Sequence, residues 1–286
     1  MFTAIADMYR NDKRFAFGFS VLLVFIVIAV ASLFAPYNTR AWNTVPRNLP
    51  PSSKHLLGTN SIGQDIFWVA LVATKNSLVL ALIAALISRV IALVIGLLSG
   101  YKGGIFDRIV MIVNDSFIII PLFPVLILIA TILRSSLSIP VLGVIIGLFG
   151  WAWDARLFRS QILSLKEREF TKTAVLSGLK TYKVIITEHL PYIVPLVMSA
   201  TINNVIWVLG MEVTLSMLGL SNLNTPTIGT MIYWVLQYQA IFLEMWNWIL
   251  TPIVICVVLI LALYMLSTSI SEYLDPRTRL QMMKAR

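Results

Sequence analysis

The sequence predicts an all-α integral membrane protein with six transmembrane helices. Three observations carry this prediction. The chain is 58% hydrophobic and 12% charged, whereas a soluble domain is about 25% charged. Its mean hydropathy is +0.87. Its apolar residues form runs of roughly 20 without strand-like alternation, which favours helices over an outer-membrane barrel. These observations exclude an ordinary soluble enzyme and a disordered chain.

Six segments are long enough to cross a bilayer. A helix that rises 1.5 Å per residue needs roughly 20 apolar residues to cross the hydrocarbon layer. The segments that meet this requirement are residues 16–35, 78–99, 109–132, 139–157, 190–215 and 247–270. The first resembles a signal peptide, because basic residues precede it. It is longer than a usual signal core and further spans follow, so we expect it to remain as a span.

The distribution of Lys and Arg predicts which side of the membrane each segment faces. With six spans, both termini lie on one side, and that side holds sixteen Lys and Arg residues against five on the other. Because the cytoplasmic loops of membrane proteins carry an excess of Lys and Arg, both termini are predicted to be cytoplasmic. The same bias accounts for the net charge of +9. Anionic membrane lipid, rather than nucleic acid, is the partner that this basic face predicts.

The spans divide the chain into three parts. Residues 1–77 form a cytoplasmic tail, the first span and an external loop, and residues 78–270 form a core of five helices. Residues 271–286 form a cytoplasmic tail. Within the core, the charged connection 158–189 is predicted to form one or two short helices against the inner membrane surface, and residues 216–246 form a second external segment.

The chain offers no catalytic chemistry of its own. We find no G-x-x-x-x-G-K-[ST] phosphate-binding loop; the nearest approach, Gly178-Leu179-Lys180-Thr181, lacks its spacing. Any ATP must therefore be bound by another chain. His55 and His189 are placed on opposite sides of the membrane, so no histidine-based triad or metal cluster is expected. The sequence predicts no catalytic residue, no metal site and no bound cofactor.

Four ionisable residues lie within the predicted spans, where each costs about 2.5–3.5 kcal/mol on insertion scales. Arg89 and Asp115 differ in depth by roughly 6 Å, which an Arg side chain can bridge, so they are predicted to form an ion pair. A structural role and a direct role in transport both stay open for this pair. Asp154 lies near the cytoplasmic end of its span and is expected to reach toward water or cap a helix. Glu212 has no evident partner in the chain, and is expected to meet either a substrate ammonium or a partner subunit.

The fifth span carries a polar stripe at steps of three and four residues, which places it on one helix face. Its members are Ser199, Asn203, Trp207, Gly210 and Thr214. Such a face is either a packing seam or the lining of a wet path. The size of Asn203 and Trp207 suits contact with solute, so these two residues and Glu212 are the candidates for a translocation path.

The cytoplasmic stretch 168–191, R-E-F-T-K-T-A-V-L-S-G-L-K-T-Y-K-V-I-I-T-E-H-L-P, resembles the E-A-A…G…I…LP coupling loop in permease subunits of binding-protein-dependent ABC importers. Gly178 matches the glycine of that loop. Ile185, Leu190 and Pro191 match its distal positions. The E-A-A triplet falls on residues 172–174, where only Ala174 is retained.

Other stretches are similar to one branch of that family, the second (C-type) permease of dipeptide, oligopeptide and nickel importers. They are H-L-L-G-T-N-S-I-G-Q-D (55–65), G-Y-K-G-G-I-F-D-R (100–108), D-x-x-x-x-x-P (115–121), L-S-M-L-G-L (215–220) and Y-L-D-P-R-T-R (273–279). Asn60 and Gln64 replace an Asp and an Arg of the branch pattern. Together these stretches cover most of the chain from residue 55 onward.

The resemblance implies a type I ABC importer permease with a cytoplasmic coupling helix between spans four and five. Its implied partners are a second permease, two ATPase subunits that bind ATP and Mg²⁺, and an external substrate-binding protein. The chain would be a non-enzymatic subunit in a prokaryotic inner membrane. The residues that the resemblance assigns to ATPase coupling are Arg168, Glu169, Lys172, Thr173, Ala174, Gly178 and Leu179.

The resemblance favours oligopeptides or dipeptides as substrate, and two alternatives stay open. Aromatic residues near the external ends of spans five and six suit sugar stacking as well as an interfacial belt, so an oligosaccharide importer is the first alternative. Nickel is disfavoured because His55 is the single external imidazole. A stand-alone channel or proton-coupled carrier is the second alternative, although the sequence shows neither an intramembrane carboxylate–histidine relay nor an inverted repeat.

Overall fold

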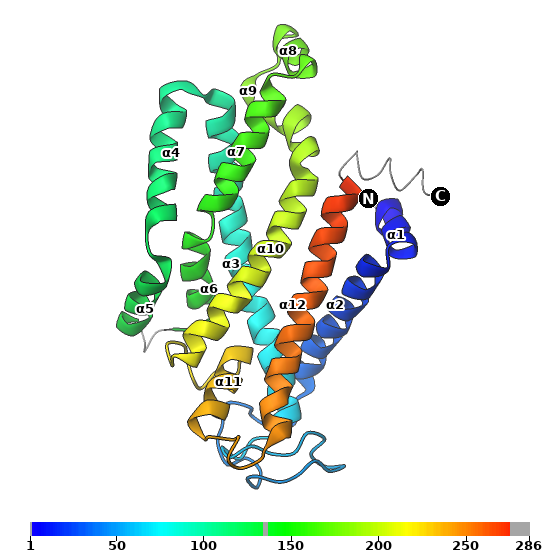
Figure 1. The fold of residues 1–286 in the computed structure, drawn as a ribbon, viewed down its shortest axis with the longest axis vertical. Helices are drawn as coiled ribbons and strands as arrows, with labels where there is room; N and C mark the ends of the chain where they lie inside the picture. The colour runs from blue at the N-terminus through cyan, green and yellow to red at the C-terminus, as the bar shows by residue number, and fades with distance from the viewer. Residues whose placement is uncertain (1, 134–136, 275–286) are drawn as a thin grey trace.

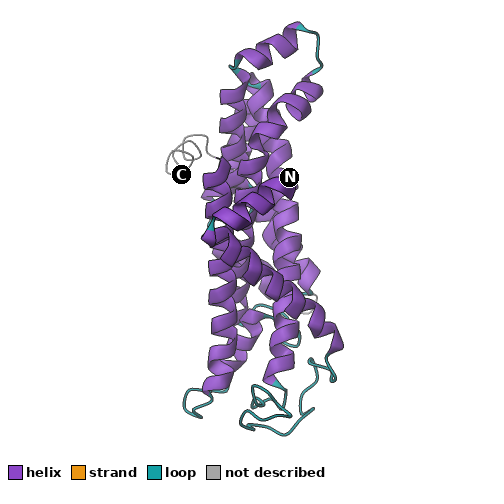
Figure 2. Ribbon diagram, turned by 90° about the vertical axis from the view of Figure 1, so that its right-hand side faces the viewer, coloured by secondary structure: helices purple, strands orange, loops and turns teal. Residues whose placement is uncertain are grey.

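The computed structural model describes residues 2–133 and 137–274 as an elongated helical bundle, with loops gathered at its two ends (Figures 1 and 2). The predicted C-terminal tail lies almost wholly outside these residues, as does most of the 273–279 motif. The N-terminal half contains α1 (Phe2–Asn11), α2 (Lys13–Ala31), the 3₁₀ turn η1 (Ser32–Phe34), α3 (Ile66–Lys102), α4 (Gly104–Ile119) and α5 (Leu122–Ile132). The C-terminal half contains α6 (Ile139–Phe149), α7 (Ala152–Lys166), α8 (Glu169–Leu176), α9 (Thr181–Lys183), the π-helical η2 (Val184–His189), α10 (Leu190–Met217), α11 (Ile228–Gln237) and α12 (Trp246–Leu274).

The described residues contain four to six candidate membrane spans, judged by helix length and apolar composition. Four helical segments are long and apolar enough to cross alone, namely Lys13–Phe34, Ile66–Lys102, Thr181–Met217 and Trp246–Tyr273. The predicted third and fourth spans are broken helices. The α4/α5 pair bends by 76° and the α6/α7 pair by 46°. Pro121 accounts for the first break, because a proline holds the preceding residue in an extended conformation and cannot continue the hydrogen-bond ladder.

Helix α3 starts at Ile66, well before the predicted start at residue 78. The predicted span begins later because polar residues, which the fold buries, interrupt the apolar run in this part of the sequence. The amide of Asn76 donates to the carbonyl of Pro226 at 2.7 Å, and the Ser77 hydroxyl accepts from the backbone N–H of Ile228 at 3.0 Å. These bonds hold α11 against α3, within the segment 216–246, for which no helix was predicted. The N-terminal tail likewise contains a helix, α1, that was not predicted.

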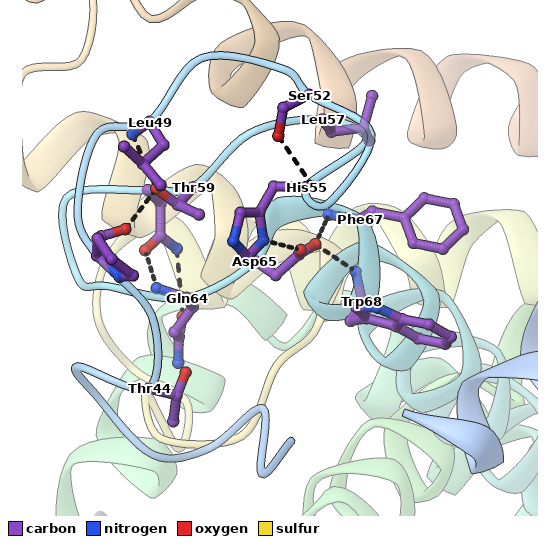
Figure 3. A network of polar contacts seen from close by, with 12 residues as sticks. Thr44, Leu49, Ser52, His55, Leu57, Thr59, Gln64, Asp65, Phe67 and Trp68 are labelled. Carbon is purple, nitrogen blue, oxygen red and sulfur yellow. Dashed lines mark hydrogen bonds and ion pairs between the residues drawn. The ribbon is translucent and has the colours of Figure 1, made fainter. Parts of the chain in front are cut away.

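A polar network holds the loop between η1 and α3, residues 35–65, onto the start of α3 (Figure 3). The Asp65 carboxylate accepts from the backbone N–H groups of Phe67 and Trp68 at 3.0 and 3.3 Å, so it caps the helix. Its other oxygen lies 2.7 Å from His55 Nδ1, and both side chains are buried. Gln64, one of the two departures from the family pattern, donates to the carbonyls of Thr39 and Ala41. The segment is therefore ordered by side-chain contacts with little secondary structure.

Helix α3 runs through the centre of the bundle and packs closely along α7. A Cβ atom added at Gly96 would lie 2.7 Å from the Ala155 carbonyl oxygen, and one at Gly100 would lie 2.8 Å from that of Arg159. Small residues thus let the two backbones approach, as is usual where membrane helices pack. Helix α4 lies at the edge of the bundle in Figure 1, where the ion pairs of Asp107 with Arg159 and of Asp115 with Arg156 join it to α7.

The two described ends of the chain meet beside each other (Figure 1). Arg14 forms an ion pair with Glu272, and the Ser269 hydroxyl donates to the Asp12 carboxylate at 2.6 Å. Burial would raise the pKa of Asp12, but this hydrogen bond and the backbone N–H of Arg14 hold the pKa below its usual range. Because α2 and α12 pack together, both ends emerge from the same end of the bundle.

Candidate functional site

Helix α8 projects at one end of the molecule, beyond the long helices (Figure 1). Its buried side carries Thr171 and Ala174, one turn apart, while Leu176 is 89% exposed. The backbone N–H of Gly178 donates to the Val175 carbonyl, and that of Leu179 donates to the Ala174 carbonyl. This is a Schellman ending, and it requires the left-handed φ of +79° found at Gly178.

The residues that the resemblance assigns to coupling lie together on α8 and its flanks. Arg168 is the extended residue before the helix, and Glu169 begins it. Lys172 Nζ lies 3.1 Å from a Glu169 carboxylate oxygen, and both side chains are exposed. Thr173 faces outward and donates to the Glu169 carbonyl, whereas Ala174 is turned inward. The helix therefore presents charged groups and an apolar tip on one accessible surface.

A cavity of about 290 Å³ lies where the two broken spans approach α10. Its polar lining comes from Asp154, Asn203 and Asn204, and its aromatic lining comes from Phe117, Phe149, Trp153 and Trp207. Two predicted path residues, Asn203 and Trp207, therefore share this cavity. Asn203 Oδ1 also accepts from the Ser267 hydroxyl at 2.9 Å, which fixes its orientation toward α12.

The break between α6 and α7 forms part of the cavity wall. The carbonyl of Gly150 at this break accepts from the Asn204 amide at 3.1 Å, as a broken helix in a membrane requires. A Cβ added at Gly150 would lie 2.8 Å from Trp207 Cζ3 and 2.9 Å from Ser88 Oγ. Asn204 was not among the predicted residues, because it lies next to the stripe in sequence and thus off its face.

The predicted pairing of Arg89 with Asp115 is wrong. Arg89 pairs with Asp154 at 2.9 Å, and Asp115 pairs with Arg156. The prediction compared depth alone, whereas the structure places α7, which carries both Asp154 and Arg156, beside both α3 and α4. Asp154 is therefore an ion-pair partner rather than a helix cap or a group reaching toward water.

Glu212 lies away from the cavity and is fully buried. Its carboxylate accepts from the hydroxyls of Thr227 at 2.5 Å, Ser216 at 2.9 Å and Ser77 at 3.3 Å. The expectation that it lacks a partner in this chain is wrong. These hydroxyls come from α3, α10 and the start of α11, so Glu212 joins these three elements and is shielded from solvent.

Residues in the two described stretches form no group of three or more His, Cys, Asp or Glu side chains suited to a metal ion. Both histidines of the chain are buried, His55 at 3% and His189 at 0% exposure. The described residues do offer a cavity between helices and a projecting helix.

Residues 92–280 match the protein family described as the binding-protein-dependent transport system inner membrane component. The oligopeptide transport system permease protein OppC of Lactococcus lactis subsp. lactis is 28% identical over 278 residues, covering 96% of this chain and 94% of that protein. The dipeptide transport system permease protein DppC of Bacillus subtilis is 26% identical, with 94% and 83% covered. The nickel transport system permease protein NikC of Escherichia coli is 32% identical over a shorter region, 60% of this chain and 63% of that protein.

Proposed function

The chain belongs to the family of binding-protein-dependent transport system inner membrane components, and from this we infer that it is a permease subunit of an ATP-driven peptide importer. It is a multi-pass protein of a prokaryotic inner membrane. Relatives named for oligopeptide and dipeptide transport match almost its whole length. The non-enzymatic character of the chain follows from the same relatives, which are permease subunits.

The six-span topology belongs to this proposal. Each bent pair, α4/α5 and α6/α7, counts as one span that is broken within the bilayer. Both termini then face the cytoplasm, as the Lys and Arg distribution predicts. The end of the bundle that carries α8 is cytoplasmic, and the end that carries the network around Asp65 is external.

Helix α8 is the proposed coupling helix. The observation that carries this role is its projection at the cytoplasmic end with Leu176 89% exposed. A large apolar side chain held out in water suits burial in a groove of a partner. That partner is an ATPase subunit, one of two in the complex, which supply the bound ATP and Mg²⁺. This chain would contact the ATPase through α8 and its flanks, residues 168–179.

The cavity beside α10 is the proposed share of this chain in the translocation path. Asn203 and Asn204 offer amide groups and Trp207 an aromatic surface, a combination that accepts both the backbone and the side chains of a peptide. A second permease subunit would complete the path, and an external binding protein would deliver the substrate. Glu212 is left out of the path because it is buried elsewhere.

Peptides are favoured over the other substrates considered. The near full-length relatives are named for oligopeptides and dipeptides, and the comparisons give no support to an oligosaccharide. Nickel would require accessible soft or imidazole ligands. Both imidazoles of the chain are buried, and His55 already contacts Asp65.

The experiment that tests this function is purification of the tagged protein from its native membrane in mild detergent, followed by mass identification. We expect a second permease and ATPase subunits to co-purify, and the reconstituted complex to transport peptides with ATP. Leu176→Asp should lose the ATPases, whereas Phe242→Asp, which changes a side chain 80% exposed at the opposite end, should keep them. A chain that purifies alone and passes solute without ATP would instead support the channel or carrier alternative.

A further inference from the structure

His189 occupies the joint between α8 and α10. It is the last residue of the π-helical turn η2, directly before α10, and its side chain is fully buried. Its ring centroid lies 5.5 Å from that of Tyr101 at the end of α3 and 6.4 Å from that of Phe170 on α8. One imidazole thus contacts aromatic rings of two other elements, α3 and α8, while its backbone leads directly into α10.

The hydrogen bonds of His189 connect it specifically to α8. Its Nε2 lies 3.0 Å from the hydroxyl oxygen of Thr171, which is itself 2% exposed. The Thr171 hydroxyl donates its single hydrogen to the Leu165 carbonyl at 2.8 Å. The same oxygen must therefore accept from His189, which places the ring proton on Nε2. Nδ1 is buried, and no described residue donates to it.

The covalent route from α8 to α10 is poorly suited to carry movement. It passes through Gly178 in a left-handed conformation, a turn, the three-residue α9 and the π-helical η2. Irregular segments of this kind bend more easily than an α-helix. A second contact, the stacking of Phe170 on Tyr192 at 5.0 Å, lies at the surface, since Tyr192 is 63% exposed. The Thr171–His189 hydrogen bond is the buried link.

On this geometry, we propose that His189 is a positioning residue that couples movement of α8 to α10 through its hydrogen bond to Thr171. The proposal rests on the proposed function of α8 as the coupling helix. When an ATPase displaces α8, the hydrogen bond displaces the first turn of α10 with it. Helix α10 also carries Asn203 and Trp207, which line the cavity. His189 contacts neither ATP nor substrate. It determines how much of the ATPase movement reaches the path.

The test compares variants of both partners within the purified complex, reconstituted into liposomes with its binding protein. Thr171→Val removes the acceptor with little change of shape, whereas Thr171→Ser keeps it. His189→Asn removes the donor at Nε2, and His189→Gln places an amide N–H near that position. Thr187→Val is the matched control, because Thr187 is exposed and its hydroxyl donates to the Lys183 carbonyl one turn away.

Two quantities are measured: peptides imported from a tryptic digest of casein per ATP hydrolysed, and hydrogen exchange in residues 190–200 with and without Mg²⁺, ATP and vanadate. We expect Thr171→Val and His189→Asn to retain the ATPase subunits but to import roughly fivefold less peptide per ATP, the factor that corresponds to one buried hydrogen bond. In the same two variants, the ATP-dependent change in hydrogen exchange of residues 190–200 should also become smaller. Thr171→Ser, His189→Gln and Thr187→Val should behave like the wild type.

An unchanged ratio of peptide to ATP in Thr171→Val and His189→Asn would overturn the proposal. So would loss of the ATPase subunits from these variants, because the bond would then serve docking or folding. Failure of the proposed function looks different: the wild-type complex itself would import no peptide when supplied with ATP.

Discussion

Arg89 and Asp154 form an ion pair whose side chains are 7% and 19% exposed, whereas Asp115 and Arg156 form one whose side chains are almost half exposed. Removing one member of a buried pair costs about 3–5 kcal/mol, because the remaining charge is left without compensation. An exposed pair contributes about 0–1 kcal/mol. We therefore expect Asp154→Asn to lower the thermal unfolding midpoint in detergent clearly and Asp115→Asn to change it little. Equal shifts of the unfolding midpoint in the two variants would contradict the expectation that the buried pair contributes more to stability than the exposed pair.

Gly178 has a φ of +79°, and a Cβ added there would meet nothing within 4 Å. Any cost of substitution thus comes from the backbone, at about 1–2 kcal/mol for an L-residue held in this region. Gly178→Val is expected to increase hydrogen exchange in α8 and to reduce transport, with the protein still inserted in the membrane. Gly178→Asn should lose less, since Asn tolerates this conformation. Similar losses for Val and Asn would contradict the backbone explanation.

Sequence reasoning located some site residues and missed others for identifiable reasons. Asn203 and Trp207 were predicted from helical spacing, and the structure places both on the cavity. The partner of Arg89 and the surroundings of Glu212 were predicted wrongly, because depth along a span does not show which helices are neighbours. The sequence did not indicate the proposed role of His189, because that role depends on its contact with Thr171, 18 residues away in the chain.

At the level of elements, the start of α3 depends on Asp65, which caps the helix and contacts His55. Asp65→Ala removes both interactions, whereas His55→Ala removes one. A lost cap costs about 1 kcal/mol, so we expect faster hydrogen exchange at Phe67 and Trp68 in both variants and a larger effect for Asp65→Ala. Equal exchange in the two would show that the cap contributes nothing beyond the His55 contact.

Apolar run length identified the long helices well but placed the start of α3 twelve residues too late. The first, fifth and sixth predicted spans correspond to α2, α10 and α12. The early start of α3 was missed because buried Asn76 and Ser77 look like loop residues until α11 supplies their partners. The break in the third span falls at Pro121 and is readable from the sequence, whereas the break in the fourth lies where Gly150 packs against Trp207 and Ser88, which the sequence does not show.

For the whole molecule, the proposed topology predicts opposite accessibility for the two ends of the bundle. In a Cys256→Ser background, which has no other cysteine, Ser53→Cys lies in the external loop and Ser177→Cys lies after α8, both exposed. In intact cells whose outer membrane has been removed, a membrane-impermeant maleimide should label the cysteine at position 53. It should label the cysteine at position 177 only after the cells are lysed. Labelling of Ser177→Cys in intact cells would reverse the orientation.

Helix α3 is 37 residues long, which at 1.5 Å per residue gives a rod of about 55 Å, against a hydrocarbon layer of about 30 Å. Asp65 fastens one end of α3 to the loop that carries His55, and Tyr101 at the other end contacts His189. If it pivots near its middle by about 10°, each end is displaced by about 5 Å, in opposite directions, by the geometry of a rod of this length. A rigid α3 that pivots in this way would link the two ends of the bundle, because any displacement at the Tyr101 end would be accompanied by an opposite displacement at the Asp65 end.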